Sequence, residues 1–233
     1  MHPLKALIYD LDGKLADTER DGHRPAFNAA FAEHGLDWVW DEALYGRLLA
    51  ITGGKERIRH YAEHYAPETA ARPGFDALVK ALHAAKTAHY VRLVGNGLLK
   101  LRPGIARLIA EARQADIRLA IATTTTPENV TALLEASLDP GASSWFEVIG
   151  AGDVVAAKKP APDIYIWVLE RLKLPASACL AIEDSENGLR SARAAGLRCL
   201  VTANDYTCGQ DFSGALAVLD DLGQTSLDDL LGR

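Results

Sequence analysis

"ALIYDLDGKLADTE" (residues 6–19) joins a short apolar run to two aspartates, Asp10 and Asp12, which are one residue apart and are followed by a glycine. Further acidic side chains follow at Asp17 and Glu19. Carboxylates this close repel each other, and a fold keeps them together mainly where they bind a cation or serve a reaction. The stretch therefore predicts a buried strand that ends in a functional site.

Four more short runs share the apolar character of the first, which is typical of strands buried on both faces in a parallel sheet. The predicted strands cover residues 6–10, 117–123, 146–150, 178–183 and 197–201. Apolar residues at helical spacing predict helices over 104–116, 163–173 and 187–195, and a short strand with a closing helix is expected after residue 209. Strand and helix in alternation indicate an α/β fold with a doubly wound, Rossmann-like parallel sheet.

The first predicted strand is followed by a long segment without a second strand pattern. A first helical pattern ends at Gly35, and further helical patterns cover 41–50, 55–65 and 74–90. Because a structureless loop of that length is uncommon in a compact domain, we expect an inserted α-helical cap domain, within which Trp38 and Trp40 are packed. The predicted boundaries are 1–17 and 98–233 for the core and 18–97 for the cap, with hinges near 17–20 and 94–98.

Composition argues against several classes of partner. The chain has 233 residues, of which 48% are hydrophobic and 24% charged, with a net charge of −6 and no long basic run. We therefore expect no nucleic acid and no membrane surface as its main partner. No apolar stretch approaches the ~20 residues of a membrane span, and a secretion signal is not recognised. The cysteines Cys179, Cys199 and Cys208 show no metal-ligand spacing, so we expect reduced thiols in a cytoplasmic protein.

The polar residues that follow the strands should meet at one place, because such sheets bind ligands outside the carboxyl ends of their strands. They are Asp10 and Asp12 after the first strand, Thr123 after the second, Lys159 after the third, and Glu183 and Asp184 after the fourth. Lys158 is the alternative candidate for the lysine of this site. Lys159 is favoured because it directly precedes Pro160. In the run of four threonines, Thr124 is a further candidate through its backbone amide.

Phosphoryl transfer through an aspartyl phosphate needs this set of groups. A carboxylate nucleophile divides the displacement into two steps, while a second acid protonates the leaving oxygen and later activates water. Mg²⁺, a hard cation that prefers oxygen ligands, neutralises the nucleophile and the phosphate together. A lysine and a hydroxyl stabilise the transferring group. Asp10, Asp12, Thr123, Lys159 and Asp184 supply each part once.

The motifs also resemble those of a known superfamily. "DLDGKLADTE", the strand-end Thr123, "KKPAPD" and "IEDSENG" are similar, in order and spacing, to the four motifs of the haloacid dehalogenase superfamily of phosphatases and phosphomutases. The insertion after the first motif resembles the helical cap of the β-phosphoglucomutase-like branch. Within that branch, four stretches resemble the CbbY-type phosphatases, namely "ERDGHRPAFNAAF" (19–31), "LYGRLLAITGGKERI" (44–58), "AAKTAHY" (84–90) and "LRPGIARLI" (101–109).

This resemblance implies hydrolysis of xylulose-1,5-bisphosphate to xylulose-5-phosphate; the bisphosphate is an inhibitory by-product associated with Rubisco, the carbon-fixing enzyme of the Calvin cycle. It implies that Asp10 is the nucleophile and a Mg²⁺ ligand, and that Asp12 is the general acid/base, with its backbone carbonyl on the metal. Asp184 would be a metal ligand, and Glu183 would lie on the metal or one layer behind it.

The same resemblance implies the substrate contacts. Thr123, the amide of Thr124 and Lys159 would bind the transferring phosphate. Lys14 departs from the family pattern, which usually has threonine at this position. Relatives of this size also imply that the protein is a monomer. The candidates for binding the sugar and its second phosphate are Glu19, His23, Arg24, Tyr45, Gly53, Gly54, Lys55, Arg57 and Lys86.

Two other functions stay open at this point. A sugar phosphomutase would return the phosphoryl group to the other end of the substrate, whereas a phosphatase releases inorganic phosphate. A non-catalytic regulator would keep the sugar-phosphate pocket and lose turnover, and Lys14 is the one hint of it in the sequence.

Overall fold

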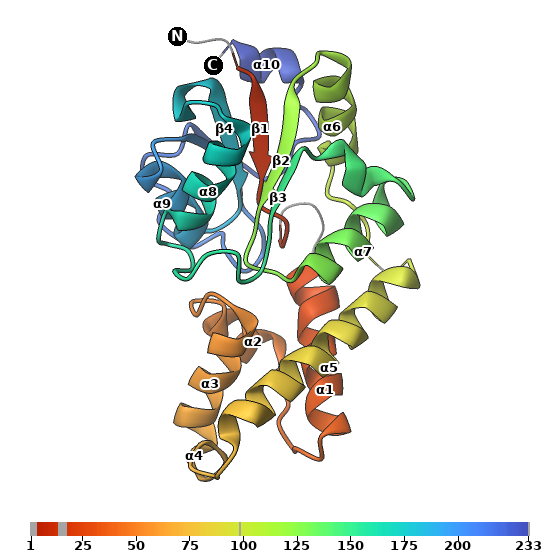
Figure 1. Ribbon diagram of the computed structural model, residues 1–233, viewed down its shortest axis with the longest axis vertical. Coiled ribbons are helices and arrows are strands. Elements are labelled where there is room, and N and C mark those ends of the chain that lie inside the picture. The colour runs from red at the N-terminus through yellow and green to blue at the C-terminus, as the bar shows by residue number, and fades with distance from the viewer. Residues whose placement is uncertain (1–3, 14–17, 98, 233) are drawn as a thin grey trace.

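A six-stranded, fully parallel sheet forms the centre of the protein (Figure 1). The computed structural model describes residues 4–13, 18–97 and 99–232. The strands lie in the order β3-β2-β1-β4-β5-β6. The strands β2 and β3 thus lie on one side of β1 and β4, β5 and β6 on the other, which confirms the predicted doubly wound sheet. The strands are β1 (Ala6–Tyr9), β2 (Arg118–Ala122), β3 (Val148–Gly150), β4 (Cys179–Glu183), β5 (Arg198–Thr202) and β6 (Ala217–Leu219).

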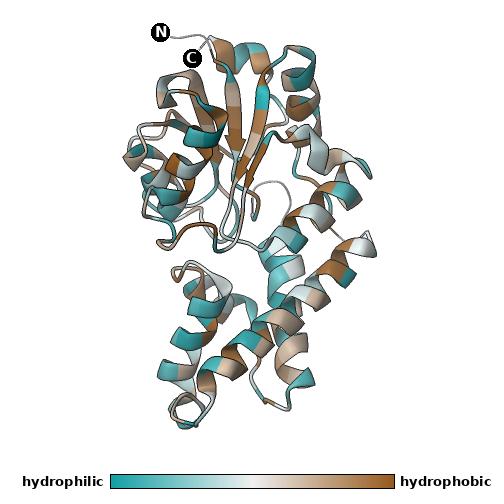
Figure 2. Cartoon of the chain, viewed as in Figure 1, coloured by the Kyte–Doolittle hydropathy of each residue, from teal (hydrophilic) through white to brown (hydrophobic). Residues whose placement is uncertain are grey.

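Helices cover both faces of this sheet, which explains why the central strand β1 is apolar at every position. On β1, Leu7 and Tyr9 belong to one buried cluster, whereas Ala6 and Ile8 belong to the other. All four side chains are fully buried, as alternation across a doubly covered sheet requires. Figure 2 shows the hydrophobic colouring gathered on the central strands. The core helices are α6 (Ile105–Gln114), α7 (Pro127–Ser137), α8 (Asp163–Leu172), α9 (Glu186–Ala194) and α10 (Leu227–Leu231).

The elements that the described residues form between β1 and α6 are all helical, so the predicted helical insertion is present. We call this insertion the cap. Trp40 is fully buried in it, with its ring 4.7 Å from Phe27 and 4.8 Å from Phe31. Trp38 packs in the same cluster, so both tryptophans serve cap packing as predicted. The cap elements are a π-helical turn η1 (Glu19–His23), α1 (Arg24–Glu33), α2 (Glu42–Leu48), α3 (Gly54–Tyr65), α4 (Pro67–Ala70) and α5 (Phe75–Gly95).

The long helix α5 joins the cap to the core. It packs along α1 within the cap and against α7 of the core (Figure 1). Residue 17 of the first predicted hinge and Lys14 lie outside the described residues, as does residue 98 of the second hinge. The cysteines are free thiols. Among the described helices, none combines the length and the apolar character needed to cross a membrane.

Candidate active site

A cleft of about 370 Å³ lies where the carboxyl ends of the strands face the cap. Residues from both parts of the chain line it, so a ligand bound there would contact the sheet and the cap together. The core contributes Asp10, Asp12, Thr123, Thr124, Lys159 and Asp184, and the cap contributes Glu19, Gly53 and Arg57.

The ammonium group of Lys159 joins the strand ends at the floor of this cleft. It donates to Asp10 Oδ1 at 2.8 Å, to Glu183 Oε1 at 2.6 Å and to the carbonyl of Ala122 at 2.9 Å. The hydroxyl of Tyr165 donates to the same Glu183 oxygen at 2.5 Å. Burial alone would lower the pKa of Lys159, but the two carboxylates outweigh it and raise that pKa, so the lysine is a fixed positive charge.

Asp10 lacks enough positive charge around it to be fully stabilised as an anion. Its pKa is raised to about 7, because burial, together with the charges of Glu183 and Asp12, outweighs the opposing charge and hydrogen bond of Lys159. Oxygens of Asp10, Glu183 and Asp184 all lie within 4.8 Å of one another. Three buried carboxylates this close fit a hard divalent cation, which would relieve their repulsion. The residues present therefore match the donor set that a metal of this kind requires.

Two glycines leave the space that the carboxylates occupy. Gly13 has a φ of +71°, and a Cβ atom there would lie 2.1 Å from Asp184 Oδ2. At Gly188 in α9, a Cβ atom would lie 2.0 Å from Glu183 Oε2. Any side chain at either position would push a carboxylate out of the cluster, which explains the glycines of the first and last motifs.

A chain of hydrogen bonds runs from Asp12 into the cap. Asp12 Oδ1 lies 2.7 Å from His23 Nε2, and Lys86 Nζ lies 2.7 Å from His23 Nδ1. Because an ammonium group can only donate, Nδ1 accepts from Lys86, and the proton on Nε2 is donated to Asp12. The His23 ring is also stacked on Tyr90, with centroids 4.2 Å apart. Asp12 is thus oriented by a cap histidine whose own ring is fixed on both sides.

The same chain of contacts determines the charges near Asp12. Burial alone would raise the pKa of Asp12, but His23, Lys86 and the hydroxyl of Thr18 hold that pKa below its usual value. Thr18 donates to Asp12 Oδ1 at 3.1 Å. Burial lowers the pKa of Lys86 to about 8, although Asp12 and Glu19 favour its charged form. Asp12 is therefore ionised near neutral pH in this state of the protein.

A second polar group on the cap faces the cleft. Tyr45 donates to Glu19 at 2.5 Å and accepts from Arg57 at 2.9 Å. Arg57 also donates to the carbonyls of Leu48 at 3.2 Å and Ile51 at 3.3 Å. It is 7% exposed, so a buried guanidinium with fixed direction stands opposite the carboxylates of the core.

The remaining predicted residues lie around the edge of this site. Lys55 pairs with Asp153 of the core, and Arg24 lies 3.4 Å from Glu42 within the cap. Lys158, the alternative to Lys159, donates to Asp153 at 2.7 Å instead of reaching the strand ends. Gly53, Gly54 and Thr124 border a neighbouring cavity of about 140 Å³ that also includes Lys55.

The cleft also has lining residues that were not predicted from the sequence, and two of them belong to the loop after β5. Asn204 and Tyr206 follow β5 and line the cleft. Asn204 Nδ2 donates to Asp184 Oδ2 at 2.7 Å. The strand-end rule that identified the other residues applies to "TAND" (202–205) as well, and that signal would have found Asn204.

Comparison with known proteins agrees with this geometry. A family described as haloacid dehalogenase-like hydrolases matches residues 4–196, which is most of the chain. The chain belongs to this family. Its membership confirms the resemblance inferred from the four motifs, and it makes the chain an enzyme of the hydrolase class.

Among haloacid dehalogenase-like hydrolases, the chain is similar to CbbY proteins. It is 56% identical over 220 residues to the plasmid-encoded CbbY of Cupriavidus necator, which covers 94% of this chain and 86% of that protein. It is 52% identical over 212 residues to CbbY of Rhodobacter capsulatus, covering 91% of each. The chain is therefore a CbbY-like member of the family, a phosphatase acting on sugar phosphates.

Solved structures of this family show the same architecture. The crystal structure of CbbY from Rhodobacter sphaeroides in complex with phosphate matches with a TM-score of 0.89 and 47% identity, covering 97% of this chain and 99% of that one. A mutant of that protein in complex with xylulose-1,5-bisphosphate matches with the same TM-score and 46% identity.

Proposed function

We propose that the protein is a Mg²⁺-dependent phosphatase that converts xylulose-1,5-bisphosphate to xylulose-5-phosphate through a phosphoryl group on Asp10. The observation that carries the proposal is the arrangement across the cleft. Asp10, Asp184 and Lys159 line its core side, and Arg57 and Glu19 line its cap side. Similarity to a CbbY protein whose structure holds xylulose-1,5-bisphosphate supports this choice of substrate.

Asp10, Asp184 and the backbone carbonyl of Asp12 would hold the Mg²⁺ ion, which when bound supplies positive charge that neutralises the nucleophile and the phosphate together. Glu183 is fully buried and its Oε1 already accepts from Lys159 and Tyr165. Its carboxylate therefore contributes mainly by holding Lys159 in place beside Asp10.

In the first half of the reaction, a carboxylate oxygen of Asp10 attacks phosphorus while the bond from phosphorus to the sugar oxygen breaks. Lys159, Thr123 and the amide of Thr124 would hold the phosphate oxygens. Asp12 is ionised before substrate arrives, and the negative charge of the incoming phosphate raises its pKa, so that it takes up a proton from solvent before the cap closes and returns one to solvent after the product leaves. Asp12 then gives this proton to the leaving sugar oxygen.

In the second half, Asp12 has become a carboxylate again and acts as a base. It takes a proton from water, whose oxygen forms a bond to phosphorus while the bond between phosphorus and Asp10 breaks. Inorganic phosphate leaves and the Asp10 carboxylate is restored. The hydrogen bonds from His23 and Thr18 hold Asp12 in the direction that both steps need.

The cap would bind the part of the substrate that does not react. Arg57 and Lys86 supply positive charge for the second phosphate, and the Glu19 carboxylate can accept from sugar hydroxyls. Binding energy gained there orients the reacting phosphate beside Asp10. Cap closure then excludes bulk water and cap opening releases the product.

The proposal includes a monomeric, cytoplasmic enzyme that removes this bisphosphate in cells using the Calvin cycle. Light scattering after size-exclusion chromatography tests the monomer. A mass of two chains would reject that part alone.

The direct test compares kcat/KM for xylulose-1,5-bisphosphate, ribulose-1,5-bisphosphate and fructose-1,6-bisphosphate in the presence of MgCl₂. We expect kcat/KM for xylulose-1,5-bisphosphate to exceed the values for the other two substrates by at least ~100-fold. One inorganic phosphate should be released for each substrate molecule consumed. Equal values would reject the narrow substrate assignment. Isomerised bisphosphate without free phosphate would indicate a mutase, and binding without turnover would indicate a regulator.

A further inference from the structure

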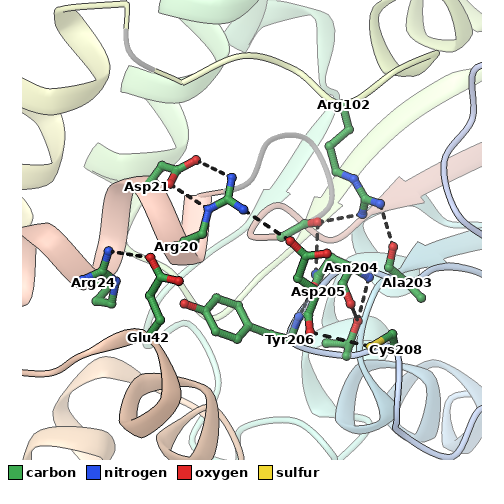
Figure 3. Close-up of polar contacts among 12 residues, drawn as sticks. Arg20, Asp21, Arg24, Glu42, Arg102, Ala203, Asn204, Asp205, Tyr206 and Cys208 are labelled. Carbon is green, nitrogen blue, oxygen red and sulfur yellow. Dashed lines mark hydrogen bonds and ion pairs between the residues drawn. The ribbon is translucent and has the colours of Figure 1, made fainter.

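The loop that follows β5 holds one of the acidic residues of the site. The side chain of Asn204 donates from Nδ2 to Asp184 Oδ2 at 2.7 Å. Through Oδ1 it accepts the backbone N–H of Tyr206 at 2.9 Å (Figure 3). One amide group therefore fixes both the direction of a carboxylate in the acidic cluster and the course of the loop itself.

The base of this loop is fixed by Arg102 (Figure 3). Its guanidinium donates to the carbonyls of Gly13 at 2.9 Å, Thr202 at 3.1 Å and Ala203 at 2.6 Å. These carbonyls belong to the turn after Asp12, to the end of β5 and to the start of the loop. One planar group thus ties the start of the loop to the end of β5 and to the turn that follows Asp12.

The tip of the loop reaches the cap. The ring of Tyr206 lies 6.1 Å from the ring of Tyr45, at an interplanar angle of 69°. At Gly46 in α2, a Cβ atom would lie 3.1 Å from Tyr206 Cδ1, so the helix backbone rests against the ring. Tyr206 thus packs against the hydrophobic cluster of the cap although it belongs to the core.

The ring, rather than the hydroxyl, makes this contact. The Tyr206 hydroxyl is buried, and among the described residues it has no hydrogen-bond partner. Tyr45, its partner across the interface, is the residue that joins Glu19 and Arg57 in the cleft. A single path of contacts therefore connects Asp184 in the core with the substrate-facing side chains of the cap.

We propose that residues 203–208 couple cap docking to the geometry of the acidic cluster, with Asn204 and Tyr206 as positioning residues. When α2 packs on Tyr206, the loop is held in the position in which Asn204 orients Asp184. By reciprocity, occupation of the acidic cluster by a cation strengthens the docking of α2 on Tyr206. This inference rests on the proposed role of Asp184 toward Mg²⁺.

The experiment measures hydrogen exchange of the α2 backbone amides, residues 42–48, with and without excess MgCl₂ and without substrate. Binding of Mg²⁺ is measured in parallel by titration calorimetry. In the wild-type protein we expect Mg²⁺ to slow exchange in α2 by ~5-fold or more. Tyr206→Phe keeps the ring and should retain this effect, and so should Cys208→Ala, an exposed position in the same loop.

Two variants should remove the effect in different ways. Tyr206→Ala should still bind Mg²⁺, weakened by no more than about the factor by which Mg²⁺ slows α2 exchange in the wild-type protein, yet its own α2 exchange should no longer respond to Mg²⁺. Asn204→Ala should lose the response and also bind Mg²⁺ about 10- to 100-fold more weakly, as expected when a residue that orients a ligand is removed.

The outcomes separate this inference from the proposed function. If the wild-type protein does not bind Mg²⁺, the proposed function fails and the coupling fails with it. If Mg²⁺ binds but α2 exchange is unaffected in the wild-type protein, or if Mg²⁺ slows α2 exchange in Tyr206→Ala or Asn204→Ala as much as in the wild-type protein, the coupling alone is refuted.

Discussion

Asp12 of the core and His23 of the cap are joined by a hydrogen bond, with His23 Nε2 2.7 Å from Asp12 Oδ1. His23 was predicted to contact substrate, whereas here its ring is 3% exposed and both of its nitrogens are engaged. The proposed acid/base is therefore oriented from the cap, and its alignment depends on how the cap sits on the core.

Replacement of His23 by glutamine should lower kcat by ~100-fold with a smaller change in KM. The variant leaves Asp12 without its ring donor, and misalignment of an acid/base group costs about that much. Steady-state kinetics on xylulose-1,5-bisphosphate provide the measurement. His89→Gln is the control, because His89 is bonded to Glu33 on the cap at 2.7 Å and should keep its kcat within ~2-fold. A normal kcat in His23→Gln would refute the role.

Lys86 should give the enzyme an alkaline limit. Burial lowers its pKa to about 8, so the ammonium loses its proton as the pH rises through that value, while it is charged below it. Since kcat/KM reports the free enzyme, we expect it to fall above pH ~8 as the charge for the second phosphate is lost. In Lys86→Arg this limb should move to higher pH, because arginine stays charged. An unchanged profile would contradict this assignment.

Lys159 and Lys158 form a matched pair for a stability test. Lys159→Met leaves Asp10 and Glu183 buried without their shared cation, which should cost about 3–5 kcal/mol and lower Tm by ~10 °C. Lys158→Met removes a pair with the largely exposed Asp153 and should cost less than ~1 kcal/mol. Thermal unfolding without metal measures the stability of both variants. Equal losses of stability would show that the buried ion pairs of Lys159 contribute no more than the exposed pair of Lys158.

MgCl₂ extends this test. A cation bound by Asp10 and Asp184 would supply part of the missing positive charge, so Mg²⁺ should raise the Tm of Lys159→Met more than that of the wild-type protein. No activity should return, because the lysine that we propose to bind the transferring phosphate is still absent.

Arg57→Lys should raise KM for the bisphosphate by at least ~10-fold and leave kcat less affected. Lysine keeps the charge but cannot reach Tyr45, Leu48 and Ile51 with one planar group. Lys55→Arg, at a partly exposed position paired with Asp153, is the control and should keep KM within ~3-fold. If both variants behave alike, Arg57 does not direct the second phosphate.

The strands were predictable because a buried strand requires a run of neighbouring apolar residues, which is visible in the sequence itself. A strand covered by helices on both faces must be apolar along its buried length, and "ALIY" (6–9) and "CLAI" (179–182) are. Their ends then place Asp10, Thr123 and Asp184 at one edge without any knowledge of the tertiary structure. The helix α7 is absent from the predicted elements, although Pro127 at its first position is typical of a helix start.

The contacts between core and cap were not predictable in the same way. Asp12 and His23 are eleven positions apart, and Lys86 joins them from a helix 63 positions further on. No local periodicity encodes such a relation, because it depends on where the two ends of the insertion return to the core. The pairing of Tyr206 with Tyr45 has the same origin, so no local pattern in the sequence predicts it.

The central claim is that Asp10 accepts the phosphoryl group, and mass spectrometry of the acid-quenched enzyme tests it most directly. Enzyme mixed with xylulose-1,5-bisphosphate and MgCl₂ is quenched in acid within the first turnover, and its peptides are analysed. We predict a phosphoryl adduct on the peptide that contains Asp10. In Asp10→Asn we expect neither this adduct nor release of phosphate. Phosphate release at the wild-type rate by Asp10→Asn, or an adduct on any other residue, would contradict the account.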